Sequence, residues 1–169
     1  MSGFGYRNLG FGGGSFVPAE FEIAKSMRFE DGDSAYLEIT HGSAGNTKLW
    51  TWSAWVKRGN LGGHVRVFSA QNSGNNSAFD AISFLSGNTF RLLFEGDVIL
   101  VSTQVFRDPS AWYHLVLAVD TAQGTAANRV KLYVNGTQVT AFSTADYPDE
   151  NYDTNFNAAR IQRLGAYAI

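Results

Sequence analysis

The chain has 169 residues, with 13 Lys and Arg against 15 Asp and Glu, no cysteine, and 17% charged residues. A chain of this length is expected to form one domain, since domains average about 150 residues. A net charge of −2 gives no reason to expect nucleic-acid binding, which needs clustered Lys and Arg. Without cysteine, the chain has no disulfide framework, thiolate zinc site or cysteine nucleophile. No uncharged apolar run reaches the ~18 residues of a membrane span, so membrane insertion is not expected.

Residues 1–25 combine repeated glycine with aromatic and aliphatic residues and show no helical or strand period. Glycine loses much backbone entropy on ordering, so we expect a flexible arm before the folded domain. A plain disordered tail competes with an arm that docks onto a neighbouring protein, and the many large apolar groups favour docking. The expected docking anchors are Phe4, Tyr6, Leu9, Phe11 and Phe16.

From residue 26 to residue 169, short apolar and alternating runs are separated by turn residues, a pattern typical of an all-β sandwich. No segment holds a sustained helical period, so helices should be single turns at most. The first expected strand contains the alternating residues 35–39. The later ones cover 49–57, 64–70, 79–85, 89–94, 98–106, 112–119, 129–134 and 137–142.

The sequences of two of these strands and of one turn support further predictions. Alternation in 49–57 places Trp50 and Trp52 on one face and Trp55 with Lys57 on the other. The nearly continuous apolar run 112–119 predicts a strand buried on both faces, and the Asn-Gly pair at 135–136 predicts a hairpin. Because the tryptophans lie within strands, we assign all of them to core and inter-sheet packing rather than to sugar platforms. They are Trp50, Trp52, Trp55 and Trp112.

No catalytic residue and no cofactor is assigned from the sequence. None of His41, His64 and His114 has a second histidine at ligand spacing, so a zinc site is not expected. Glycoside hydrolases need paired carboxylates, and the central strands carry no ladder of acids, which favours a non-enzymatic protein. Calcium stays open as an alternative to simple turn formation for the carboxylates in loops and at strand ends. These are Asp31, Asp33, Asp80, Asp120, Asp146, Asp149, Glu150 and Asp153.

The segment 145–157 mixes tyrosine with amide and carboxylate groups. Sugars are held by this mixture, with an aromatic face for the C–H surface and planar polar groups for the hydroxyls. An ordered loop that covers the edge of the sandwich would have the same composition and is the alternative. Loop 72–77 is a second candidate by the same reasoning. The candidate ligand-binding residues are Tyr147, Asp149, Asn151, Tyr152 and Asp153, together with Asn72, Asn75 and Asn76.

Three motifs follow one another along the chain: WTWSAWVK at 50–57, DPSAWYHLVLAVD at 108–120 and RVKLYVNG at 129–136. In order and content they resemble the concanavalin A-like, laminin G-like domains. This resemblance covers the chain from about residue 26 onward and implies an antiparallel jelly-roll β-sandwich. The same fold serves lectins, adhesion modules, hydrolase accessories and virion proteins, so it does not identify a function.

Further sequence segments, including QVFRDP at 104–109 and residues 147–153, resemble laminin G-like domains of tailed-bacteriophage structural proteins such as tail fibres. The resemblance implies a virion location, docking of the arm on other virion proteins and a homo-oligomeric or multi-copy assembly. It also implies adhesion to cell-surface glycan through loops at the sandwich edge. The alternatives are a purely architectural protein, for capsid decoration or tail scaffolding, and a glycan hydrolase or its accessory domain.

The sequence departs from that family at its C-terminal end. Members close with a strand of the type Gly-apolar-apolar-x-Glu-apolar beside the first strand, whereas this sequence ends with RLGAYAI at 163–169. We therefore expect the domain to lack its closing strand. The chain would then be a fragment of a longer protein, or another subunit would fill the place by strand addition.

Overall fold

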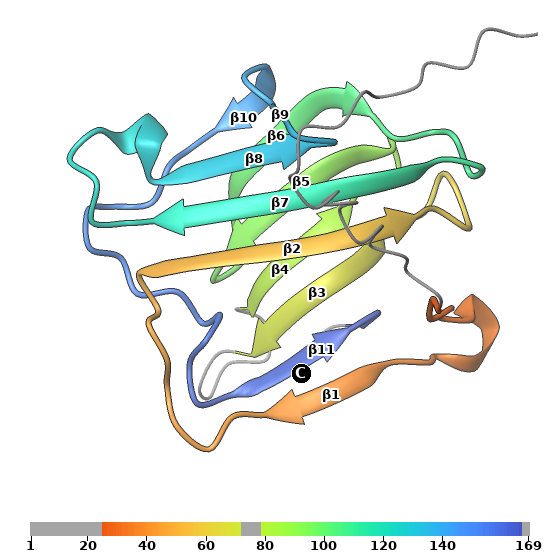
Figure 1. Cartoon of the computed structure of the whole chain (residues 1–169), viewed down its shortest axis with the longest axis horizontal. Helices are drawn as coiled ribbons and strands as arrows, with labels where there is room; N and C mark the ends of the chain where they lie inside the picture. The colour runs from red at the N-terminus through yellow and green to blue at the C-terminus, as the bar shows by residue number, and fades with distance from the viewer. Residues whose placement is uncertain (1–24, 72–78, 167–169) are drawn as a thin grey trace, which may run out of the picture.

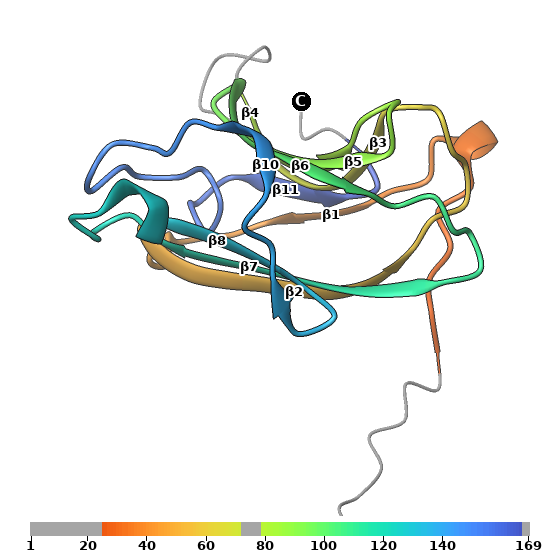
Figure 2. The same ribbon diagram turned by 90° about the horizontal axis from the view of Figure 1, so that it is seen from above.

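The structure of the chain, a computed structural model, describes residues 25–71 and 79–166. Two antiparallel sheets pack face to face as a β-sandwich, which confirms the expected all-β jelly-roll fold (Figures 1 and 2). Docking of the N-terminal arm stays a prediction, because its expected anchors lie outside the described residues. These anchors are Phe4, Tyr6, Leu9, Phe11 and Phe16.

The larger sheet has seven strands and the smaller has four. In spatial order, the seven-stranded sheet contains β1 (Leu37–Thr40), β11 (Ile161–Leu164), β3 (Val65–Gln71), β4 (Phe79–Phe84), β5 (Thr89–Phe94), β6 (Asp97–Val105) and β10 (Phe142–Ala145). The four-stranded sheet contains β2 (Leu49–Lys57), β7 (Trp112–Asp120), β8 (Val130–Val134) and β9 (Thr137–Gln138). The described chain also has two single turns of 3-10 helix, η1 (Asp31–Asp33) and η2 (Ala126–Asn128). None of its helices is long and apolar enough to span a membrane.

Strand β2 has the bounds and the two faces that its alternating sequence predicts. Trp50 is buried and Trp52 half-buried against the core, while Trp55 and Lys57 on the opposite face are exposed. All nine residues of β2 pair with β7 without a register shift. Each row of side chains therefore continues from β2 onto β7.

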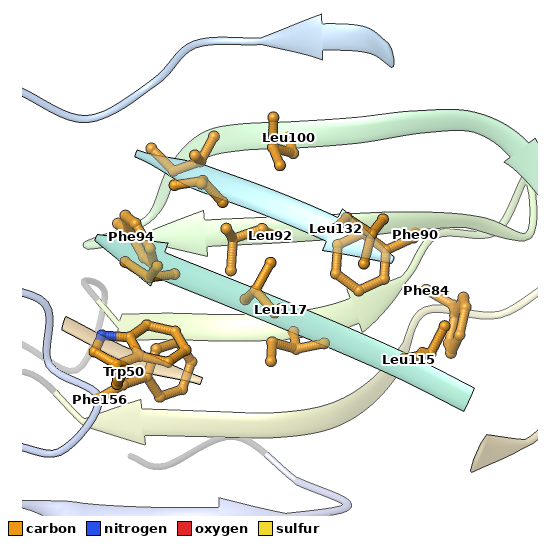
Figure 3. Packing of buried hydrophobic residues seen from close by; sticks show 14 of the residues in the cluster. Trp50, Phe84, Phe90, Leu92, Phe94, Leu100, Leu115, Leu117, Leu132 and Phe156 are labelled. Atoms are coloured by element: carbon orange, nitrogen blue, oxygen red, sulfur yellow. The ribbon is translucent and has the colours of Figure 1, made fainter. Parts of the chain in front are cut away.

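The hydrophobic core fills the space between the two sheets (Figure 3). Leu92 of β5 and Leu117 of β7 are fully buried within it, and burial of each such side chain stabilises the fold by about 1.5–3 kcal/mol. At one end, Phe156 meets Trp50 edge to face with ring centroids 5.1 Å apart and stacks on Phe68 at 5.1 Å. Because Phe156 precedes β11, these contacts anchor the C-terminal segment in the core.

The prediction that residues 112–119 are buried on both faces is wrong. Strand β7 buries Leu115, Leu117 and Val119 against the core, but His114 and Val116 on its other face are only half-buried. Within the described residues, no second layer covers the outer face of the four-stranded sheet (Figure 2). The neighbouring strands β2 and β8 shield the apolar side chains there without burying them fully.

The prediction of a single strand over residues 137–142 is also wrong. Strand β9 covers only Thr137 and Gln138, and after one further backbone hydrogen bond, from Val139 to Leu132, the chain crosses to the other sheet, where Phe142–Ala145 pairs with β6. Val139 and Phe142 pack against the core on either side of this crossing. The crossing allows both apolar side chains to be partly buried at the side of the sandwich, which a continued flat hairpin would not do.

The smaller sheet leaves the side of the larger one at β1 and β11 uncovered (Figure 1). Leu37 and Ile39 of β1 are accordingly 46% and 55% exposed. β11 lies between β1 and β3. A strand from the C-terminal region therefore does pair with β1, the first strand, and the expectation that this place is empty is wrong. The polar residues Gln162 and Arg163 interrupt the apolar pattern of β11, which is why the sequence did not reveal this strand.

Candidate functional site

The predicted ligand-binding segment around residues 147–153 is an ordered loop that packs against the sandwich. The ring of Tyr152 stacks on Phe94 with centroids 5.8 Å apart, and burial raises the pKa of its hydroxyl well above the ordinary value of 10.0. Tyr147 is half-buried and packs against the core. The two aromatic faces on which the prediction depended are therefore turned inward.

Hydrogen bonds and one ion pair hold the same loop to the residues beside it. The N–H of Asn151 donates to the carbonyl of Thr121 at 2.8 Å, and the hydroxyl of Thr121 donates to the carbonyl of Tyr152 at 2.7 Å. Asp153 accepts a hydrogen bond from the Thr47 hydroxyl and lies 3.6 Å from the ammonium group of Lys48.

The polar candidates of this loop point to solvent, and their role in ligand binding stays a prediction. Asp149, Asn151 and Asp153 are exposed. Three further candidates, Asn72, Asn75 and Asn76, lie outside the described residues.

A different surface presents aromatic rings to solvent, on the outer face of the four-stranded sheet. Trp55 and Trp112 are 51% and 46% exposed. Their assignment to the core is therefore wrong, whereas Trp50 is a core residue as predicted, at 8% exposed. Trp55 stands opposite His114 in the ladder and stacks on its ring, with centroids 4.9 Å apart and planes at 21°.

These rings border an open hollow of about 520 Å³. It lies where β8 ends at Val134, the residue paired with Leu115 of β7, and the hairpin turn begins. We call its lining the tryptophan surface, which consists of Trp55, Trp112, His114, Asn135 and Gly136.

Neighbouring groups hold the rings of this surface in place. The Ser53 hydroxyl and Nε2 of His114 lie 2.9 Å apart, and Nζ of Lys57 lies 5.9 Å from the centre of the Trp112 ring. Each contact restricts one ring of the tryptophan surface, that of His114 or that of Trp112. A preorganised aromatic surface loses little side-chain entropy when a ligand binds.

Asn135 lines the hollow beside the aromatic rings. It adopts a left-handed conformation with φ of 50°, followed by Gly136 with φ of 81°, which confirms the predicted Asn-Gly hairpin turn. Its N–H donates to the carbonyl of His114 and its Oδ1 accepts from the N–H of His114, both at 2.8 Å. The side-chain amide is thus fixed by Oδ1, and its Nδ2 group has no hydrogen-bond partner in the described part of the chain.

The chemistry of this surface suits a ligand with both C–H and hydroxyl groups. The C–H face of a sugar can stack on an indole ring, while the Asn135 amide and the His114 ring supply hydrogen-bonding groups. The tryptophan surface contains no carboxylate, so it lacks the acid pair that glycoside hydrolysis uses. Residues 25–71 and 79–166 contain no group of three or more metal-ligating side chains, and calcium binding stays untested.

The sequence contained a signal for this surface. Alternation had already placed Trp55 on the face opposite Trp50, together with the polar residues Ser53 and Lys57. A tryptophan in a row of polar side chains is expected to face solvent, whatever its position within a strand. The pairing of Trp55 with His114, in contrast, depends on the register between two strands that are distant in sequence.

Comparison with known proteins supports the fold. Two structural neighbours are the heptameric SAP-like pentraxin of Limulus polyphemus, with a TM-score of 0.53 and 15% identity, and the CBM40 domain of the Ruminococcus gnavus IT-sialidase, with 0.51 and 13%. The match covers 76% of this chain and 56% of the pentraxin chain, so the chain spans little more than half of that relative. For the CBM40 domain it covers 80% of this chain and 81% of that one.

That domain has also been solved with bound α2,3-sialyllactose, and this complex matches with the same TM-score, 0.51, and the same identity, 13%. No curated protein matches the sequence. A family model does match, over residues 31–166. The chain belongs to the concanavalin A-like lectin/glucanases superfamily.

Proposed function

We propose that the chain is a non-enzymatic glycan-binding module whose ligand lies on the tryptophan surface. The observation that carries this proposal is the pair of half-exposed indoles, Trp55 and Trp112, beside the fixed amide of Asn135. Large aromatic side chains grouped in an exposed hollow are typical of binding sites, because folded proteins rarely expose large contiguous apolar surfaces otherwise. The sialyllactose complex of the CBM40 neighbour, a protein of the same fold, is consistent with it.

The module would act as part of a phage particle, in a tail fibre or another virion appendage. The resemblance to tailed-phage domains supports this role, and the apolar anchors between Phe4 and Phe16 would attach the chain to another virion protein. A homo-oligomeric or multi-copy arrangement would repeat a weak site many times on one particle, which raises the overall avidity for a cell surface. The heptamer of the pentraxin neighbour is an example of such an arrangement on this fold.

A purely architectural role, in capsid decoration or tail scaffolding, is the second candidate. It is favoured by the loop 147–153, whose tyrosines stabilise the sandwich edge instead of facing solvent. In that case the loops and the outer face would make no glycan contact, and the chain would contribute only its rigid sandwich and its arm.

Glycan-array binding of the purified chain, followed by titration of the retained glycans, tests the proposal. Trp55→Ala and Trp112→Ala are each expected to weaken binding tenfold or more, because aromatic anchors at the centre of a site are worth about 1.4 kcal/mol or more. Leu49→Ala is the matched control, since Leu49 is 56% exposed on the same face of β2 at its other end. Absence of any bound glycan, or equal losses in all three variants, would contradict the proposal.

A further inference from the structure

A second open hollow, of about 380 Å³, adjoins the tryptophan surface. It lies at the side of the sandwich where the chain crosses from β9 to β10 and passes β6. Asn135 lines both hollows, so they meet at the hairpin turn. We call its lining the polar groove, which consists of Thr103, Gln104, Val134, Asn135, Thr137, Gln138, Val139, Thr140 and Ala141.

The lining of the polar groove combines hydrogen-bonding side chains with a few apolar residues. Val134, which is buried, and Val139, which is half-buried, are its less exposed apolar lining residues. Gln104, Gln138 and Thr140 are exposed, and their side chains make no hydrogen bond with any residue of the described part of the chain. Two amides and a hydroxyl are therefore available as donors and acceptors for a hydroxyl-rich ligand.

Neither hollow has a Lys, Arg, Asp or Glu in its lining. Lys57 lies beside Trp112, but it is not part of the lining. A carboxylate, sulfate or phosphate group is normally held by Arg or Lys, whose hydrogen bonds to anions are roughly twice as strong as neutral ones. The two linings therefore favour a ligand without charge.

We infer that the tryptophan surface and the polar groove form one extended site for a neutral oligosaccharide of at least two sugar units. One sugar stacks on the indoles, the next lies in the polar groove, and the fixed Nδ2 group of Asn135 donates to a hydroxyl near the linkage between them. Both volumes lie in or near the range of about 300–1,000 Å³ that ligand pockets have. The inference rests on the proposed glycan binding and adds the length and the charge of the ligand.

The test begins with a glycan array of neutral mono-, di- and trisaccharides of glucose, galactose, mannose and N-acetylglucosamine, with their sialylated and sulfated counterparts. Retained glycans are expected to be neutral and to contain two or more sugars. In calorimetric titration, affinity is expected to rise tenfold or more from the monosaccharide to the disaccharide of the same series. A preference for charged glycans, or equal affinity for both lengths, would overturn the inference.

The double variant Gln104→Ala/Gln138→Ala separates the two hollows. It is expected to remove most of the rise in affinity from the monosaccharide to the disaccharide, while affinity for the monosaccharide stays within twofold of that of the unmodified chain. Trp55→Ala is expected to weaken the binding of the monosaccharide and of the disaccharide. Gln123→Ala, which removes an exposed glutamine outside both hollows, is the control, and thermal unfolding of every variant verifies the fold.

The outcomes of the two tests are distinguishable. If the array retains glycans but the double variant binds disaccharides as tightly as the unmodified chain, the extended site is refuted and the proposed glycan binding stands. If no glycan of any length or charge is retained, the proposed function fails and the extended site fails with it.

Discussion

At the scale of single residues, the buried carboxylate of Asp80 connects three parts of the chain. One of its oxygens, Oδ1, accepts hydrogen bonds from the N–H of Glu95 at 2.8 Å and from the side-chain amide of Asn155 at 3.0 Å. The other, Oδ2, accepts from the N–H of Asn155 at 2.7 Å. Asp80 thereby fastens the start of β4 to the turn between β5 and β6 and to the segment that carries Phe156 into the core.

Stability is expected to depend on pH through this group. Burial raises the pKa of Asp80 above its ordinary value of 3.8, and hydrogen bonds from the Asn155 side chain and from the backbone of Glu95, Asn155 and Phe156 oppose the shift without cancelling it. A raised pKa in the folded state means that the neutral acid is favoured there. The contribution of Asp80 to the free energy of unfolding is therefore largest at pH values below 3.8 and is lost as pH rises through the folded-state pKa.

Asp80→Asn measures that contribution. The variant has no titration at this position and leaves a buried N–H without its acceptor, so it is expected to be less stable by about 1–3 kcal/mol. Urea unfolding of both proteins between pH 4 and pH 8 gives the difference in free energy of unfolding. The advantage of the unmodified chain should grow as pH falls, and an advantage that shrinks toward acid would refute the sign of the pKa shift.

At the scale of elements, the two faces of β2 perform different tasks. The inner face stabilises the sandwich, since Nε1 of Trp50 donates to the Thr154 hydroxyl at 2.9 Å and its ring meets Phe156. The outer face carries Trp55, whose contacts are with His114 and solvent. A single nine-residue strand thus links the core to the proposed binding surface.

Truncation of each tryptophan is expected to separate these tasks. Trp50→Ala should cost about 3–5 kcal/mol, as for other large-to-small changes in a core, because it leaves a cavity and removes the indole N–H that donates to the Thr154 hydroxyl. Trp55→Ala should cost about 1 kcal/mol or less, because half of that side chain is already in water. Denaturant unfolding of both variants gives the two values, and similar losses would show that the outer indole is part of the structural core after all.

At the scale of the whole molecule, both hollows belong to the described residues of the sandwich, while the proposed docking anchors belong to residues 1–24, which are not among the described residues. Binding and attachment are therefore expected to be separable. The uncovered side of the larger sheet at Leu37 and Ile39 is a further apolar surface on the same molecule.

Deletion of residues 1–24 tests the proposed attachment. The shortened chain should keep its affinity for the retained glycans and should no longer be incorporated into phage particles. Mass spectrometry of purified particles gives the copy number, and glycan titration of the shortened chain is the control. Particles that carry the shortened chain at the normal copy number would refute docking through the arm.

The sequence alone determined the features that depend on local pattern. Alternation with period two predicted the sandwich and the two faces of β2, because neighbouring side chains of a strand point to opposite sides. The Asn135–Gly136 turn was predictable for an equally local reason, since both residues tolerate the left-handed conformation that the hairpin requires.

Only the tertiary structure decided which residues from distant strands meet. The stack of Trp55 on His114 follows from the pairing of β2 with β7, and the polar groove arises where the crossing after Gln138 passes β6. The inward packing of Tyr152 likewise depends on Phe94, which is remote in sequence. These contacts join residues that are distant in sequence, so no local pattern contains them, and the proposed binding surface is a product of strand register and sheet packing.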